Sequence, residues 1–70
     1  MKKISFRQKE SALFNLDSTW VKLMNELYEK PECEDELIDR IDEINNLIDK
    51  VHIGRVTYSE WNRIQEIVNA

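Results

Sequence analysis

Glycine and proline, the residues that shape most tight turns, each occur only once in this chain of 70 residues. A β-sheet protein of this size needs several tight turns, which Gly, Asn-Gly or Asp-Gly usually form. Neither dipeptide is present, and the single glycine is Gly54. The sequence therefore predicts an all-α protein. We expect one domain over residues 1–70, a small antiparallel bundle of three to four helices joined by short turns.

The segment from Glu32 to Ile53 has the clearest helical pattern. Its apolar residues recur at alternating steps of four and three, which places them along one face of a helix. They are Leu37, Ile41, Ile44, Ile48 and Val51. Pro31 suits the first turn of such a helix, where its missing N–H costs nothing, and Gly54 suits the left-handed conformation that commonly ends one. We therefore predict a helix whose apolar face forms the centre of the core.

A shorter helix is predicted over residues 58–68. Thr57 and Glu60 have the spacing of a capping box, in which each side chain bonds the backbone N–H of the other residue. Val56 and Trp61 stand at the positions of the accompanying hydrophobic staple. The face expected to be buried comprises Trp61, Ile64, Ile67 and Val68. Because the connecting turn is short, this helix should pack back on the preceding one.

The residues upstream of the proline predict a third helix, whose start is less clear. Its apolar face is marked by Trp20, Leu23, Met24, Leu27 and Tyr28. Asp17 or Ser18 is a suitable N-cap, and the proline prevents further extension. Ser5 and Gln8 also have capping-box spacing. Residues 5–16 therefore form either a separate short helix or the first half of one continuous helix.

The composition excludes several classes of protein. A formal charge of −4 and a hydrophobic content of 41% suit a small soluble domain. No window approaches the roughly 18 apolar residues of a membrane span, and the charged N-terminus lacks a signal-peptide core, so we expect a cytoplasmic protein. One cysteine and one histidine, Cys33 and His52, cannot form an internal disulfide or a Cys/His zinc site.

No group of residues predicts catalysis. His52 has no serine or cysteine at a spacing that implies a nucleophile and its base, and the chain has no glycine-rich phosphate loop. A concave active site is also hard to build on so small a core. We therefore expect no catalytic residues, no metal site and no cofactor.

Residues 49–60 resemble the twelve-residue calcium loop of EF-hand proteins. Asp49, Gly54 and Glu60 occupy its first, sixth and twelfth positions. The third and fifth positions, which supply side-chain oxygens in that family, are valine and isoleucine here, so an ion would lose two ligands. The same residues also fit a helix that ends at glycine, followed by a capping box. The sequence favours this structural interpretation and leaves open whether the segment binds any ion.

A row of carboxylates in the central helix is the strongest candidate for a binding surface. Asp35, Asp39, Asp42 and Asp49 fall at helical spacing opposite the apolar face. Carboxylates about 5 to 6 Å apart on a rigid helix form a line of negative charge on a scale comparable to a nucleic-acid backbone. Such a face fits a basic groove on another protein, whereas the simpler interpretation is the solvated side of an amphipathic helix.

The predicted partner-binding residues add flanking carboxylates and two aromatic rings that we expect to be partly exposed. The full set is Glu32, Asp35, Glu36, Asp39, Asp42, Glu43, Asp49, Phe14 and Tyr28.

Basic residues are concentrated at the N-terminus. Of the ten basic side chains, four lie in the first nine residues, and the remaining six are accompanied by all fourteen acidic side chains. A basic arm can reach into a nucleic-acid groove, or it can be a solubilising terminus that folds back on the acidic helix. The net negative charge favours the second interpretation, because it repels a polyanion.

These observations predict a non-enzymatic protein that docks on a larger protein through its acidic helix face and exposed aromatics. Its most concrete form is an inhibitor of a nucleic-acid-binding host protein. In size, acidity and lack of a catalytic group, the chain resembles phage-encoded and mobile-element proteins that block host defence or transcription enzymes. The alternative is a small dimeric nucleic-acid-binding regulator that uses the basic N-terminal arm and the C-terminal helix pair. A self-assembly module is a third hypothesis, and the chain is also a candidate homodimer.

Overall fold

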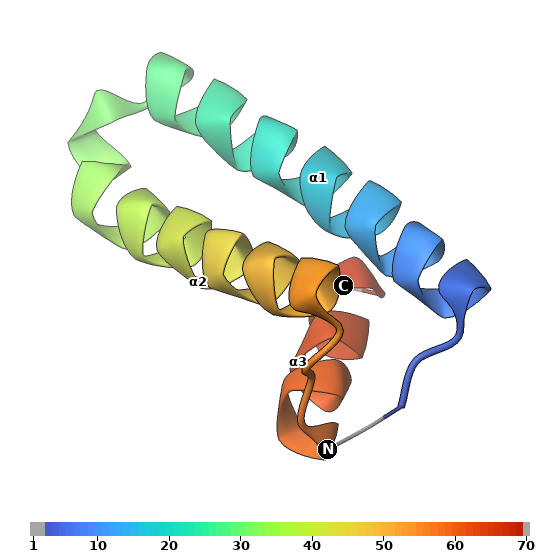
Figure 1. Ribbon diagram of the computed structural model, residues 1–70. Helices are drawn as coiled ribbons and strands as arrows, with labels where there is room; N and C mark the ends of the chain where they lie inside the picture. The colour runs from blue at the N-terminus through green and yellow to red at the C-terminus, as the bar shows by residue number, and fades with distance from the viewer. Residues whose placement is uncertain (1–2, 70) are drawn as a thin grey trace.

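The computed structural model describes residues 3–69, which are all-α as predicted (Figure 1). Helix α1 spans Phe6–Glu29, a 3-10 turn spans Pro31–Cys33, α2 spans Glu34–Ile53 and α3 spans Tyr58–Val68. Helices α1 and α2 form an antiparallel hairpin, and α3 crosses it near the start of α1 and the end of α2 (Figure 1). This pairwise packing is consistent with the expected bundle.

Helix α1 is one continuous helix of 24 residues. It begins at the predicted capping box, where Ser5 Oγ accepts from the N–H of Gln8 at 3.2 Å and Gln8 Oε1 accepts from the N–H of Ser5 at 3.0 Å. The prediction of an N-cap at Asp17 or Ser18 is wrong, since both residues lie inside the helix with exposed side chains. Because the helix runs unbroken through these positions, their N–H groups are bonded within the helix and need no cap.

The helix boundaries lie beside the single proline and the single glycine, although α2 begins at Glu34 and not in the turn that contains Pro31, as was predicted. Helix α1 ends at Glu29, and Pro31 opens the 3-10 turn that leads into α2. At the other end of α2, Gly54 has φ +82° and its N–H donates to the carbonyls of Lys50 and Val51. The N–H of Arg55 also donates to the Lys50 carbonyl, at 3.1 Å. These bonds form a Schellman motif, which turns the chain toward α3.

Replacing Gly54 with alanine should destabilise the protein through the backbone alone. A Cβ at this position would meet no atom within 4 Å, so the cost is the left-handed conformation itself, about 1–2 kcal/mol. Asparagine tolerates this conformation better. Urea unfolding should therefore rank Gly54 above Gly54→Asn, and Gly54→Asn above Gly54→Ala. Equal stability of all three proteins would contradict the assigned cap.

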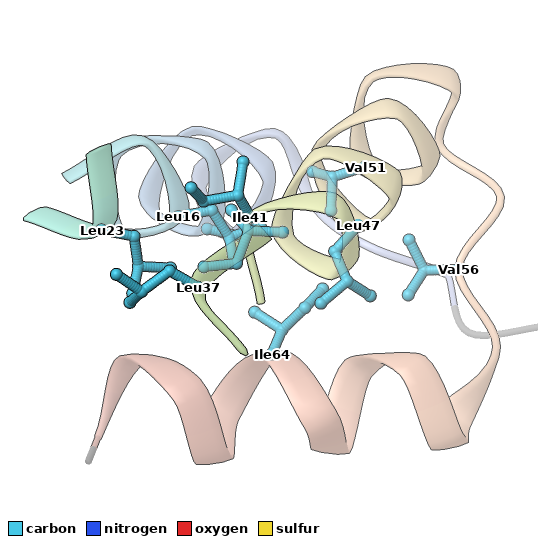
Figure 2. Close-up of a cluster of buried hydrophobic side chains, with 10 residues drawn as sticks. Leu16, Leu23, Leu37, Ile41, Leu47, Val51, Val56 and Ile64 are labelled. Carbon is cyan, nitrogen blue, oxygen red and sulfur yellow. The ribbon is translucent and has the colours of Figure 1, made fainter. Parts of the chain in front are cut away.

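The core lies inside the hairpin and continues under α3 (Figure 2). Its buried residues are Ala12, Leu16, Leu23, Leu37, Ile41, Ile44, Leu47, Val51, Val56 and Ile64. The predicted apolar face of α2 is confirmed, with Ile48 only half-buried. Leu47, which the pattern did not include, is also buried because it lies on the side of α2 toward Val56 and Ile64 (Figure 2).

Candidate functional site

The four aspartates of the predicted row, Asp35, Asp39, Asp42 and Asp49, are all exposed. They share α2 with the buried residues, but they lie on its opposite face, because their positions are offset by two residues from the buried stripe. From the first to the last aspartate, the row extends about 21 Å along the helix. The helical period alone therefore places these carboxylates in solvent.

The basic side chains nearest this row bind other carboxylates. Arg40 Nη2 lies 3.8 Å from Glu36 Oε1, and Lys50 Nζ lies 3.1 Å from Glu60 Oε2. Across residues 3–69, no ion pair reaches any of the four aspartates. None of the four aspartates is therefore neutralised by a direct ion pair within the described part of the chain.

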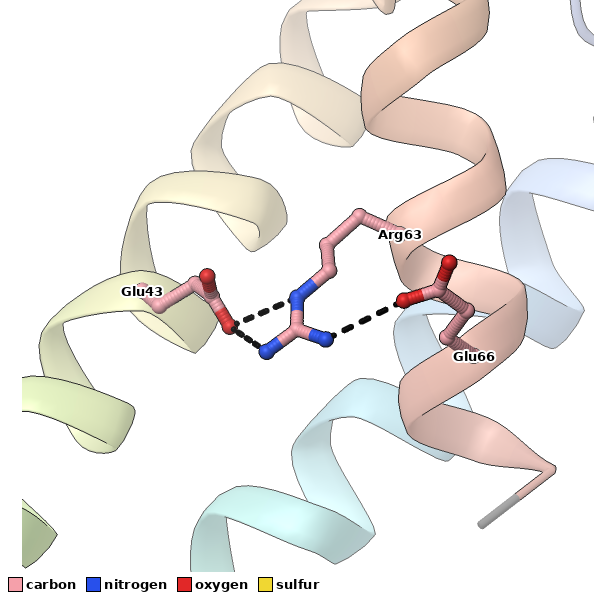
Figure 3. Close-up of polar contacts among 3 residues, drawn as sticks. All are labelled: Glu43, Arg63 and Glu66. Carbon is pink, nitrogen blue, oxygen red and sulfur yellow. Dashed lines mark hydrogen bonds and ion pairs between the residues drawn. The ribbon is translucent and has the colours of Figure 1, made fainter.

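Glu43 differs from the aspartates because it binds a cation within the protein. Its Oε1 accepts from Arg63 Nε at 3.0 Å and from Arg63 Nη2 at 2.8 Å, while Glu66 Oε2 accepts from Arg63 Nη1 at 3.2 Å (Figure 3). Hydrogen bonding to Glu43, and then to Glu66, raises the pKa of the Arg63 guanidinium above its ordinary value. Glu43 thus joins α2 to α3 and is already occupied by Arg63.

Glu60 is engaged in two further contacts at the start of α3. Its Oε1 accepts from the Thr57 N–H at 3.0 Å, and the Glu60 N–H donates to Thr57 Oγ1 at 3.1 Å, as the predicted capping box requires. The Thr57 backbone bond is the main reason that the pKa of the Glu60 carboxyl is lowered; partial burial opposes it and Lys50 reinforces it. Because the folded-state pKa is below that of the unfolded chain, this stabilisation is present above about pH 4.3. It is lost as the pH falls through the lower folded value.

Glu60→Gln should therefore have an effect on stability that depends on pH. The amide retains an oxygen that can accept the Thr57 bond, but it removes the charge. We expect the free energy of unfolding to fall by about 0.5 kcal/mol at pH 7, and the difference from the wild type to shrink below about pH 4. Urea unfolding at pH 7 and pH 3 measures both values. Glu10→Gln, at an exposed carboxylate, is the control, and an undiminished Glu60→Gln effect at pH 3 would contradict the assignment.

The two middle aspartates of the row, Asp39 and Asp42, border a shallow groove between α2 and α3. Its polar lining comes from Asp39, Asp42, Glu43 and Asn46 of α2 and from Ser59, Glu60 and Arg63 of α3, with Arg63 bound to Glu43. A basic side chain entering this groove would meet carboxylates from both helices. The sequence pattern could not show this groove, because it depends on where α3 packs.

The two aromatic rings of the predicted set are exposed as expected. Phe14 is 72% exposed and Tyr28 is 92% exposed, both on α1. The hollow beside Phe14 is lined by Asp17, Ile48 and His52 and by none of the predicted carboxylates. The predicted set therefore divides into carboxylates on α2, with Glu32 in the turn before it, and rings on α1.

The segment that resembles an EF-hand loop is mostly helical. Residues 49–53 belong to α2 and residues 58–60 belong to α3, so only 54–57 form a connection. The Glu60 carboxylate is occupied by Thr57 and Lys50. Among residues 3–69, no cluster of three or more His, Cys, Asp or Glu side chains has the arrangement of a metal site.

The basic N-terminal region is partly used within the fold. Lys9 Nζ donates to the backbone carbonyl of His52 at 3.0 Å, at the negative end of the α2 dipole. Lys3 and Arg7 are exposed, and Lys2 lies outside the described residues. The only basic side chain of α3 is Arg63, which binds Glu43 and Glu66.

Comparisons with known proteins identify no family for this chain. The chain matches no protein-family model, no curated protein and no solved structure at a significant level. Within the described residues, no helix has the length and hydrophobicity that crossing a lipid bilayer requires. Function is therefore inferred from the residues themselves.

Proposed function

We propose that this protein is a non-enzymatic binding protein that docks the acidic face of α2 on a basic surface of a larger protein. One observation carries the proposal: the four exposed aspartates have no cation partner within residues 3–69, although Arg40 and Lys50 are on the same helix. A row of uncompensated like charges repels itself, and a complementary surface relieves that repulsion. Charge complementarity of this kind also speeds the encounter and selects the partner.

The partner surface is proposed to be one that otherwise binds nucleic acid. A rigid line of negative charge about 21 Å long presents to a basic groove the same kind of field as a phosphate backbone. A protein bound there excludes nucleic acid from the groove. The protein would then act as an inhibitor, in the manner of the phage-encoded proteins that it resembles in type, and would act in the cytoplasm where such partners lie.

The alternative, direct binding of nucleic acid by the basic arm and the α2–α3 pair, has less support. It needs free cations on those elements. Lys3, Arg7 and Arg55 are exposed and form no ion pair within residues 3–69, but Lys9 binds the His52 carbonyl and Arg63 binds two carboxylates. The acidic row would also face the phosphates of any nearby nucleic acid with like charge.

The test starts from capture and ends on competition. The immobilised protein is incubated with nuclease-treated lysate of its own source, and each captured protein is purified and tested for binding to a short labelled DNA duplex. We expect the captured partner to bind the duplex and to release it when this protein is added. A partner whose duplex binding is unaffected would overturn the inhibitor proposal. Salt-sensitive binding of the duplex by this protein alone would favour the regulator.

A further inference from the structure

A hollow of about 340 Å³ lies where α3 crosses the first half of α1 (Figure 1), and no residue of α2 lines it. Its apolar lining comes from Ala12 of α1 and from Trp61 and Val68 of α3. Ala12 is buried, and the other two side chains are half-buried. An apolar surface with a few polar groups around it is the usual lining of a small-molecule site.

The rest of the lining is polar. It comprises Arg7, Gln8, Ser11 and Asn15 of α1 and Gln65 of α3. The four residues of α1 fall on one side of the helix, because they are spaced at one, three and four positions. Of these five side chains, only that of Gln8 forms a hydrogen bond within residues 3–69, through Oε1 to the N–H of the N-cap serine. The donors of the other four are therefore available to a ligand.

The hollow has a positive character that is unusual in this chain. Arg7 is its only charged side chain, and it forms no ion pair within residues 3–69. Glu10, one turn further along α1, does not line the hollow. Three other hollows each contain a carboxylate, from Asp42, Glu43 or Asp17. The first turn of α1 has no acidic residue and is the positive end of the helix dipole, so this hollow favours an anion.

We propose that this hollow binds a small aromatic monocarboxylate. The Arg7 guanidinium has the fork geometry that pairs with a carboxylate through two parallel N–H···O bonds. Ser11 and Asn15 supply further donors from the same side of α1, and the Trp61 indole offers a surface to the ring of the ligand. A single cation matches one negative charge, whereas a phosphate dianion would bring excess negative charge to a protein of net charge −4.

The size of the hollow also favours a small ligand. Ligand pockets range from about 300 to 1,000 Å³, and this one is at the lower end of that range. The proposed site shares no residue with the acidic face of α2, so it is independent of the proposed docking function.

An NMR titration of the isotope-labelled full chain with benzoate tests the proposal. The amide signals around Arg7, Ser11 and Gln65 and the indole signal of Trp61 should shift and saturate at millimolar benzoate. Benzamide has the same ring and a similar size but no charge, and it should bind about tenfold more weakly or worse. The absence of saturation, equal affinity for benzamide, or tighter binding of phenyl phosphate would overturn the proposal.

Two arginine variants separate a site from a general attraction of anions to basic side chains. Arg7→Gln removes the cation at an exposed position and should weaken benzoate binding about tenfold or more. Arg55→Gln makes the same exchange at an exposed arginine outside the hollow and should leave the dissociation constant unchanged. Both variants have the same net charge, so equal losses of affinity would contradict the assigned site.

Discussion

Ile64→Ala is expected to remove most of the stability of the protein and to leave a large fraction of it unfolded at 25 °C. Ile64 is 0% exposed and is the only buried residue of α3, and it points from α3 into the core beside Leu47 (Figure 2). Truncating a buried isoleucine to alanine costs about 2–5 kcal/mol. A core in a chain below roughly 70–80 residues rarely supplies more than about 3–5 kcal/mol. The loss therefore approaches the whole stability of the domain.

Circular dichroism during urea or thermal unfolding measures this effect. Ile53→Ala is the matched control, because it makes the same truncation at a residue that is 69% exposed. It should change the free energy of unfolding by no more than about 0.5 kcal/mol. Similar losses for the two variants would show that Ile64 does not hold α3 on the hairpin.

The helices could be predicted from the sequence because their determinants are local. The four-three spacing of Leu37, Ile41 and Ile44 defines one face of α2 without reference to the rest of the chain. Capping boxes and a left-handed glycine likewise act within a single turn of backbone, as Ser5 and Gly54 confirm.

Features that depend on how helices meet could not be predicted in this way. Leu47 is buried because α3 covers its side of α2, and a period within α2 does not say where α3 lies. The Arg63–Glu43 pair joins positions 20 residues apart, so no spacing rule identifies it. The sequence also left open whether α1 continues through Asp17, because a polar residue suits an N-cap and an exposed helical position equally well.

The candidate site likewise combines features that the sequence predicts with features that depend on the folded structure. The exposure of Asp35, Asp39 and Asp42 follows from the period of α2 and is confirmed. Their lack of cation partners needed the structure, because Arg40 and Lys50 are near them in sequence but bind Glu36 and Glu60. Whether the row docks on a partner stays a prediction.

Reversing the charge of the acidic row is expected to abolish docking while the helices remain intact. Asp35, Asp39 and Asp42 make no ion pair within residues 3–69, so their replacement by lysine breaks no internal contact of that kind. Loss of Asp35 from the first turn of α2 should cost about 0.3–1 kcal/mol through the helix dipole. Placing lysines against a basic surface costs several kcal/mol, which lowers affinity by about a hundredfold to a thousandfold.

The matched control changes the net charge equally on another helix. Glu10, Glu26 and Glu29 of α1 are exposed, and none of them forms an ion pair within the described residues. Their triple replacement by lysine separates an effect of net charge from an effect of position. Circular dichroism of both variants establishes that each remains folded.

Isothermal titration of the purified partner with the wild type, the α2 triple variant and the α1 triple variant tests the central claim most directly. We predict that the wild type and the α1 variant bind with affinities within about tenfold of each other, equivalent to 1.4 kcal/mol, and that the α2 variant shows no measurable heat of binding. Undiminished binding by the folded α2 variant would contradict the claim that this protein acts through the carboxylates on the outer face of α2.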